Sequence, residues 1–215
     1  MDIAILLFDG LTALDAIGPY EVLKAIPGST ILTVAPVKGL KRTDGGLEIC
    51  ADYSFGEVTK ADILVVPGGM GTRVLMHDPV VRNWVRDIHD TTKWTASVCT
   101  GALILGAAGV LRDRKATTHW TQLERLREFG AEPVRERVVF QGKVVTCAGV
   151  SAGIDMALRL VHRMGGDLAA QMIQLAMEYD PDPPFRAGSP DKAPPEVVDA
   201  VKQASREREK AFVTT

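Results

Sequence analysis

The stretch WTASVCTGALILGAA, residues 94–108, decides the fold class, because within it a short apolar strand turns directly into a helix of small residues. Trp94–Val98 predicts a buried strand, and no loop residues separate it from Cys99, Thr100 and Gly101. A strand-to-helix elbow of this kind holds its middle residue in a tight conformation and projects the side chain beyond the strand. The pattern therefore indicates that Cys99 is a nucleophile.

The position of Cys99 also bears on its reactivity. The helix predicted to begin at Thr100 aims free N–H groups and the positive end of its dipole at the sulfur, which favours the thiolate. The alternative is that Cys99 fills the core as a small hydrophobe, because cysteine is among the most buried residue types. The spacing alone leaves both interpretations open.

Upstream of the elbow, apolar runs alternate with helical patterns. Buried strands are predicted at Ile3–Phe8, Thr30–Ala35 and Ile63–Val66. A helix over Leu14–Ile26 carries Gly18-Pro19, which predicts a kink, and we expect Pro27-Gly28 to end it. A further helix begins with Asp78 as its N-cap. This alternation predicts an α/β fold with a mostly parallel sheet, helices on both faces, and a site at the carboxyl ends of the strands.

Downstream of the elbow the same alternation continues. The patterns predict a weak strand at Lys115–His119, a helix at Thr121–Phe129, a hairpin of Val138–Phe140 and Val144–Cys147, helices at Ser151–Met164 and Asp167–Tyr179, a proline-rich segment at Asp180–Pro195 and a charged C-terminal helix. A chain of 215 residues has room for one substantial core. We therefore expect a single α/β domain over residues 1–215, in which residues 190–215 form a surface C-terminal segment.

Charge and composition narrow the choice of partners. The chain has 25 Lys and Arg against 27 Asp and Glu, and this formal charge of −2 offers no general attraction to nucleic acid or to an anionic membrane. The N-terminal apolar run is too short for a signal peptide or a membrane span. We expect a cytoplasmic protein with a small-molecule partner, no nucleic-acid partner and no membrane partner.

The three cysteines are Cys50, Cys99 and Cys147. They form no CxxC pair, which argues against a disulfide framework and a zinc site, and no histidine has metal-ligand spacing. We expect reduced thiols and no metal. Cys50 and Cys147 lie in strand-like apolar stretches without a helix N-terminus beside them, which predicts buried and unreactive side chains.

Three further features are candidates for the site. Asp15 lies among apolar residues, so burial would raise its carboxyl pKa and let it act as an acid, although a helix-capping role fits equally well. The Gly68-Gly69 turn would supply an N–H group that faces developing charge together with the Thr100 N–H, or it is simply a tight turn. His119 would act as a base to Cys99 if the fold brings the two together.

Several motifs together resemble a known superfamily. LDAIGP at residues 14–19, VPGG at 66–69, SVCTG at 97–101 and ATTHW at 116–120 resemble the PfpI-like branch of the class I glutamine amidotransferase-like superfamily. AGID at 152–155 and the tail from Glu178-Tyr179 to Pro190-Asp191 resemble the isocyanide hydratases within that branch. The elbow and VPGG belong to the whole superfamily, ATTHW also occurs in sensor domains of AraC-type regulators, and the tail points to the hydratases.

The resemblance implies a flavodoxin-like three-layer sandwich that forms a homodimer and places a carboxylic acid beside the elbow cysteine. That catalytic pair carries over to Cys99 and Asp15, with Thr100 next to them and with neither a metal nor an organic cofactor. The residues expected to bind substrate or an oxyanion are Gly68, Gly69, Gly149 and Val150. The chain departs from the family with AGVS at 148–151 in place of Gly-Gly-Ile-Thr, which changes the bulk near the cysteine and hence the expected substrate size.

The implied reaction is the hydration of an organic isocyanide to an N-substituted formamide through a covalent Cys99 thioimidate, with Asp15 delivering a proton. Two alternatives stay open. One is a cofactor-free glyoxalase or deglycase acting on α-oxoaldehydes, and the other is a non-enzymatic cysteine sensor of oxidants or ligands. We expect no helix-turn-helix region, because the sequence ends at Thr215, soon after the hydratase-like tail.

Overall fold

The computed structural model describes residues 1–213. The chain forms two compact units, Met1–Met177 and Glu178–Thr215. The first unit contains the central sheet and all the residues that we expect in the site. Our expectation of one domain over residues 1–215 stays a prediction.

Strands and helices alternate through the first unit, as the sequence predicts. The strands are β1 (Asp2–Leu6), β2 (Thr30–Ala35), β3 (Gly39–Arg42), β4 (Glu48–Ala51), β5 (Tyr53–Ser54), β6 (Ile63–Val66), β7 (Trp94–Val98), β8 (Lys115–Ala116), β9 (Glu132–Pro133), β10 (Val138–Gln141) and β11 (Val144–Cys147). The helices are α1 (Ala13–Leu23), α2 (Thr72–Leu75), α3 (Pro79–Thr91), α4 (Gly101–Ala107), the 3-10 helix η1 (Trp120–Phe129) and α5 (Ala152–Ala176).

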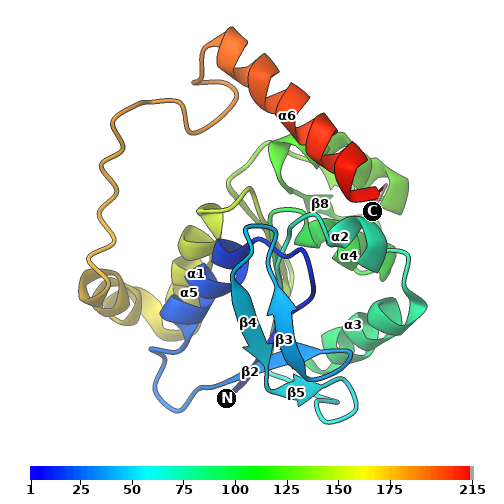
Figure 1. The fold of residues 1–215 in the computed structure, drawn as a ribbon. Coiled ribbons are helices and arrows are strands. Elements are labelled where there is room, and N and C mark those ends of the chain that lie inside the picture. Colours follow the sequence, from blue (N-terminus) through cyan, green and yellow to red (C-terminus); the bar gives the residue numbers. More distant parts are fainter. Residues whose placement is uncertain (214–215) are drawn as a thin grey trace. The chain divides into compact units, whose positions relative to one another are not determined.

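Seven strands form the central sheet in the order β10-β11-β7-β6-β1-β2-β5. Every neighbouring pair is parallel except β10 with β11, which form the predicted hairpin. Helices α1 and α5 pack together on one face of the sheet, and α2, α3 and α4 lie on the other (Figure 1). The predicted α/β architecture, with a mostly parallel sheet between two helical layers, is confirmed.

The central strands are buried on both faces. Ile3, Leu64 and Val98, one from each of β1, β6 and β7, have no exposed side-chain surface. Burying a large apolar side chain stabilises the fold by about 1.5–3 kcal/mol, which explains why β1 and β6 are largely continuous apolar runs; β7 also contains the buried polar residues Thr95 and Ser97. Because helices cover both faces, polar groups of the strands are accessible to a ligand at the strand ends.

Helix boundaries follow local chemistry, with some departures from the sequence interpretation. The Asp78 carboxylate accepts a hydrogen bond from Val80 N at 2.8 Å and caps α3 as predicted. Helix α1 ends at Leu23, before Pro27-Gly28, and the next residues form turns in which Ala25 N and Ile26 N bond to the carbonyls three residues before them. The predicted helix before Gly130 is the 3-10 helix η1, and Gly130 ends it with a left-handed φ of 74°.

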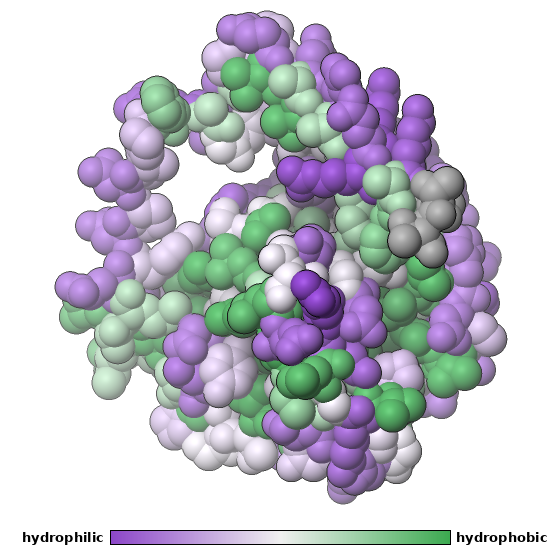
Figure 2. All heavy atoms as spheres, viewed as in Figure 1, coloured by the Kyte–Doolittle hydropathy of each residue, from purple (hydrophilic) through white to green (hydrophobic). Residues whose placement is uncertain are grey.

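The β3–β4 hairpin is absent from the sequence interpretation. It forms a separate two-stranded antiparallel sheet and lies in front of the central sheet in Figure 1. Apart from the buried Ala51, its residues alternate between exposed and half-buried, so no continuous apolar run marks it. Cys50 lies on β4 and is exposed, so our prediction that it is buried is wrong. Apolar and polar side chains are interspersed over the face that this view presents (Figure 2).

The second unit contains the helix α6 (Pro195–Val213), preceded by a proline-rich segment without regular helix or strand up to Pro194. The predicted charged C-terminal helix is therefore present. Within residues 1–213, none of the helices combines the length and apolar character that a membrane span needs.

Candidate functional site

The elbow between β7 and α4 holds Cys99 in an unusual backbone conformation. Its φ is 55°, a left-handed value that non-glycine residues rarely adopt and that costs about 1–3 kcal/mol. The Cys99 N–H donates to the carbonyl oxygens of Cys147 and Ala148, both at 3.2 Å, and the Cys99 carbonyl accepts from the Thr118 hydroxyl at 2.7 Å. Hydrogen bonds from the neighbouring strand therefore stabilise the strained residue.

Two glycines let the turn after β6 approach the elbow. A Cβ atom at Gly101 would overlap the carbonyl oxygen of Val66, and a Cβ at Gly68 would lie 2.5 Å from the Thr100 nitrogen. Neither contact is tolerated between heavy atoms, so larger residues would push the elbow away from this turn. The glycines thus bring the backbone of the Gly68-Gly69 turn against Thr100.

Asp15 lies on α1 and is completely buried. Its Oδ2 accepts a hydrogen bond from the Gly68 N–H at 2.9 Å, whereas Oδ1 has no regular hydrogen-bond partner within residues 1–213. The Cys99 thiol interacts with this same carboxyl group. Burial raises the Asp15 pKa from 3.8 to about 7, although the Gly68 N–H and the thiol act in the opposite direction.

Cys99 is 5% exposed, and burial raises the pKa of its thiol above the usual value, with the nearby Asp15 charge raising it further. The N–H and hydroxyl of Thr100 hydrogen-bond the sulfur and lower the pKa, as expected for the start of α4. They do not outweigh burial, so our expectation of a lowered thiol pKa is wrong. The resting thiol is protonated, and the buried carboxyl beside it titrates near neutral pH.

Thr100 also contacts the turn after β6. The Gly69 N–H donates to Thr100 Oγ1 at 2.9 Å, and the Gly68 N–H is used by Asp15. The Gly69 N–H is therefore not free to face a substrate, contrary to our expectation, because the Thr100 hydroxyl has taken it. The two glycines position the side chains of Asp15 and Thr100 instead.

Two residues that the sequence interpretation did not include complete this network. Thr72 is wholly buried, and its hydroxyl donates to the Gly69 carbonyl at 2.7 Å and lies 3.2 Å from Thr100 Oγ1. Arg73 Nη1 donates to the same carbonyl at 3.2 Å. Both belong to the four-residue helix α2, which is too short to give a helical pattern in the sequence.

Gly149 and Val150 connect β11 to α5 and are half-buried. Within residues 1–213 their N–H groups donate to no other group of the chain, whereas the carbonyl of Ala148 just before them binds the Cys99 N–H. The two donors are therefore available to a ligand beside the elbow. This arrangement is compatible with the binding role that the resemblance implies for both residues.

His119 packs against this segment without bonding to the cysteine. Its Nδ1 lies 2.7 Å from the Thr121 hydroxyl and accepts from the Thr121 N–H at 3.4 Å, which caps η1. Burial and then the nearby Arg73 charge lower its pKa, which favours the neutral ring. Within the described part of the chain, the His119 ring bonds to Thr121 and makes no hydrogen bond to the Cys99 thiol.

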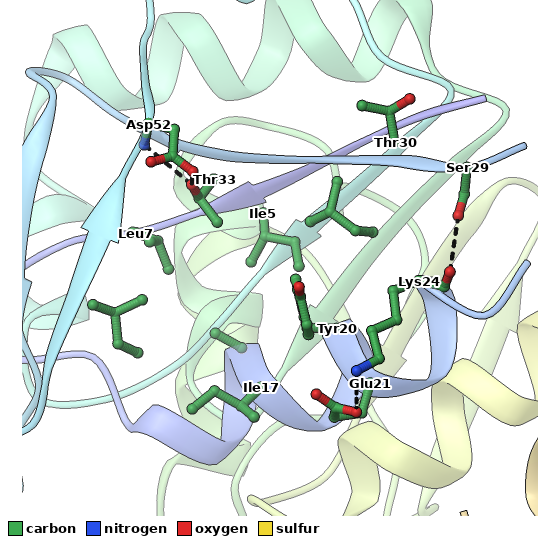
Figure 3. A pocket seen from close by; sticks show the side chains of 13 residues that line it. Ile5, Leu7, Ile17, Tyr20, Glu21, Lys24, Ser29, Thr30, Thr33 and Asp52 are labelled. Carbon is green, nitrogen blue, oxygen red and sulfur yellow. Dashed lines mark hydrogen bonds and ion pairs between the residues drawn. The ribbon is translucent and has the colours of Figure 1, made fainter. Parts of the chain in front are cut away.

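A cavity of about 630 Å³ lies apart from the elbow, between α1 and the strands β1 and β2. Ile5, Leu7 and Ile17 form an apolar floor, and Tyr20, Glu21 and Lys24 lie at its edge (Figure 3). Asp15 lies on the same helix but binds Gly68 and is not among the lining residues. The cavity therefore shares α1 with the site but does not contain its reacting groups.

Together, fold and site define an α/β protein with a cysteine at a strained strand-to-helix elbow and a buried carboxylic acid beside it. The chain belongs to the DJ-1/PfpI family, whose model matches residues 1–163. A curated relative from Pseudomonas putida, "Isonitrile hydratase", is 40% identical over 94% of this chain and 89% of its own length.

Solved structures agree with this placement. A THiJ/PfpI family protein from Pseudomonas syringae has a TM-score of 0.94 and 38% identity, over 98% of this chain and 88% of that one. The flavodoxin-like sandwich implied by the resemblance is thereby confirmed. Among the curated relatives, a deglycase from Thermococcus kodakarensis is 30% identical in sequence over 68% of this chain and 89% of its own length.

Proposed function

We propose that this protein is an isocyanide hydratase, a lyase that adds water to an organic isocyanide and releases the N-substituted formamide. The single observation that carries the proposal is the contact between the Cys99 thiol and the buried Asp15 carboxyl, whose pKa is about 7. The isonitrile hydratase from Pseudomonas putida supports the substrate class, since isonitrile is another word for isocyanide and the likeness extends over 94% of the chain.

The first step forms a bond between sulfur and the terminal carbon of the isocyanide. Asp15 takes the thiol proton as the sulfur attacks, and it delivers this proton to the same carbon, so that the product is a thioimidate with one C–H bond and one C–S bond. A carboxyl with a pKa near 7 suits both transfers, because it gains and loses a proton at similar cost at neutral pH.

The second step adds water to the thioimidate carbon. Asp15, now a carboxylate, takes one proton from the water and passes it to the nitrogen, and the second water proton goes to the sulfur through Asp15 as the C–S bond breaks and the C=O bond forms. The products are the formamide and the Cys99 thiol, so one isocyanide and one water are consumed. The free N–H groups of Gly149 and Val150 are the donors that orient the substrate or water, whereas the Thr100 hydroxyl bonds to the sulfur. The steps require no cofactor.

A product assay tests this proposal directly. The purified protein is incubated with phenyl isocyanide, and N-phenylformamide is measured by liquid chromatography. Formation of the formamide by the wild type, at least about a hundredfold slower formation by Asp15→Asn, and none above background by Cys99→Ala are the expected results. The proposal is wrong if the wild-type protein leaves the isocyanide unchanged, or if Cys99→Ala retains full activity.

A glyoxalase or deglycase activity is the second candidate, favoured by the 30% identity to the Thermococcus kodakarensis deglycase. An elbow cysteine adds to an aldehyde carbonyl as readily in principle as to an isocyanide carbon. Methylglyoxal consumption at a specificity constant above that for phenyl isocyanide would favour this candidate. We expect the isocyanide to be the better substrate, because the likeness to the hydratase is higher and spans more of the chain.

We further propose that the protein acts as a homodimer in the cytoplasm. The open apolar cavity between α1 and β2 supports a dimer, since a second copy seated there would bury the floor around Ile17. The three free cysteines are compatible with a reducing compartment. Analytical ultracentrifugation tests the first point: we expect a dimer at micromolar concentration, and a monomer would contradict it.

A further inference from the structure

Thr72 has no part in the proposed reaction, yet its hydroxyl lies at the centre of the hydrogen bonds behind the elbow. Thr72 is the first residue of α2 and is wholly buried. Its Oγ1 donates to the Gly69 carbonyl at 2.7 Å and lies 3.2 Å from Thr100 Oγ1. A buried hydroxyl in this place affects the acceptor to which the Thr100 hydroxyl donates its proton.

The Gly69 carbonyl oxygen has more donors around it than it has lone pairs. It offers two lone pairs, whereas four donors lie within reach: the Thr72 hydroxyl at 2.7 Å, Arg73 Nη1 at 3.2 Å, the Thr100 hydroxyl at 3.2 Å and the Thr72 N–H at 3.3 Å. The Thr72 hydroxyl is the closest, and its distance is the optimum for an O–H donor. It therefore occupies the carbonyl in preference to the Thr100 hydroxyl.

The Thr100 hydroxyl has one proton, for which the Gly69 carbonyl and the Cys99 sulfur compete. Thr72 Oγ1, a third acceptor 3.2 Å away, already accepts from Arg73 Nη1 at 3.1 Å. The Thr100 oxygen already accepts from the Gly69 N–H at 2.9 Å. The proton goes either to the Gly69 carbonyl, at 3.2 Å, or to the Cys99 sulfur, which also hydrogen-bonds this hydroxyl. With Thr72 and Arg73 on the carbonyl, the sulfur is the acceptor that remains.

We propose that Thr72 is a positioning residue: by occupying the Gly69 carbonyl, it directs the Thr100 hydroxyl proton to the Cys99 sulfur. The inference rests on the proposed function only in treating Cys99 as the nucleophile. A hydrogen bond donated to sulfur stabilises the thiolate more than the thiol, so Thr72 increases the thiolate fraction without touching the substrate.

Alkylation by iodoacetamide tests this inference, because it reports the thiolate without any isocyanide. The rate is followed by mass spectrometry on the peptide that contains Cys99, across a range of pH. In Thr72→Val we expect about tenfold slower alkylation near neutral pH and a rate profile displaced by about one pH unit upward. Thr72→Ser retains the hydroxyl and should alkylate within about twofold of the wild type.

A double-mutant cycle separates action through Thr100 from a general loss of packing. If Thr72 acts through the Thr100 hydroxyl, the double variant Thr72→Val/Thr100→Val alkylates no more slowly than Thr100→Val alone. Thr92→Val is the matched control, because the buried Thr92 hydroxyl also donates to a carbonyl, that of His89 at 2.9 Å, and contacts another threonine at 2.7 Å. Thr92 lies before β7, at the opposite end of the strand from Cys99. Alkylation of Cys99 in Thr92→Val should therefore proceed at the wild-type rate.

Three results would overturn the inference: wild-type alkylation by Thr72→Val, equal slowing by Thr72→Ser, or single effects that multiply in the double variant. Thermal unfolding is measured for every variant, and Thr72→Ala, which removes the same hydroxyl with less bulk, replaces Thr72→Val if the latter does not fold. The failure of isocyanide hydration in the wild type would refute the proposed function and leave these alkylation results interpretable.

Discussion

Cys99 directly follows β7, and Cys147 ends the neighbouring strand β11, yet only Cys99 has the surroundings of a nucleophile. Cys147 is the last residue of β11 and pairs with Val98 of β7, so the two cysteines lie at the same edge of the sheet. Burial raises both thiol pKa values. Cys147 continues a regular strand, whereas Cys99 has a φ of 55° and receives hydrogen bonds from Thr100. Backbone geometry and the hydrogen bonds from Thr100, not residue type or burial, distinguish the two cysteines.

The largest expected effect comes from exchanging the two cysteines for alanine separately. Cys99→Ala should lower isocyanide hydration at least about a thousandfold, because the covalent route is lost. Cys147→Ala, the matched control, loses one buried sulfur and should keep the activity within about threefold. Formamide production by both variants is the measurement, and comparable losses in the two would mean that the elbow has no special role.

Asp15, the buried acid beside Cys99, makes the free energy of unfolding depend on pH. The Asp15 pKa is raised from 3.8 to about 7 on folding, so its contribution to stability is complete below pH 4 and is lost as the pH rises through 7. The full loss is about 4 kcal/mol for a shift of this size. Urea unfolding of the wild type between pH 4 and pH 8 should show this decline, and Asp15→Asn should not. Parallel curves for the two proteins would contradict a buried acid beside Cys99.

Gly101, after β7, and Gly149, after β11, should differ in how well they tolerate replacement by alanine. In Gly101→Ala the new Cβ meets the Val66 carbonyl, which is fixed in β6, and we expect a loss of about 3 kcal/mol or more. In Gly149→Ala it meets the His119 ring, a side chain that is able to move, and we expect about 1 kcal/mol. Chemical denaturation measures both, and the reverse order would show that the elbow is not the tightly packed region.

His119 should have the smallest effect. His119→Asn retains an acceptor near Thr121 N and removes the rest of the ring, so η1 remains capped. Because the histidine makes no bond to the thiol, we expect less than a threefold change in the rate of formamide formation. A loss of a hundredfold would instead place His119 in the reaction.

Much of this account was predictable from the sequence, and the exceptions have physical causes. Strands β1 and β6 are runs of buried apolar residues that mark them without a structure, and β7 was recognised by the elbow that follows it. The β3–β4 hairpin has half-exposed strands, and this is why its pattern was missed and Cys50 was expected to be buried.

The site was predictable to a similar degree. Cys99 and Asp15 were candidates from local spacing and apolar neighbours, and the family resemblance paired them. Thr72 carried no signal, because its importance arises from contacts across the turn after β6 with Gly69 and Thr100. The raised thiol pKa was also missed, since the extent of burial depends on how α1 and the elbow pack together.

Trapping of the covalent intermediate tests the central claim most directly. The protein is mixed with phenyl isocyanide, quenched with acid during turnover, digested and analysed by mass spectrometry. The account predicts an adduct with the mass of the isocyanide on the peptide that contains Cys99, and none on the peptide that contains Cys147. Formamide production with no adduct on Cys99, or with the adduct on Cys147, would contradict it.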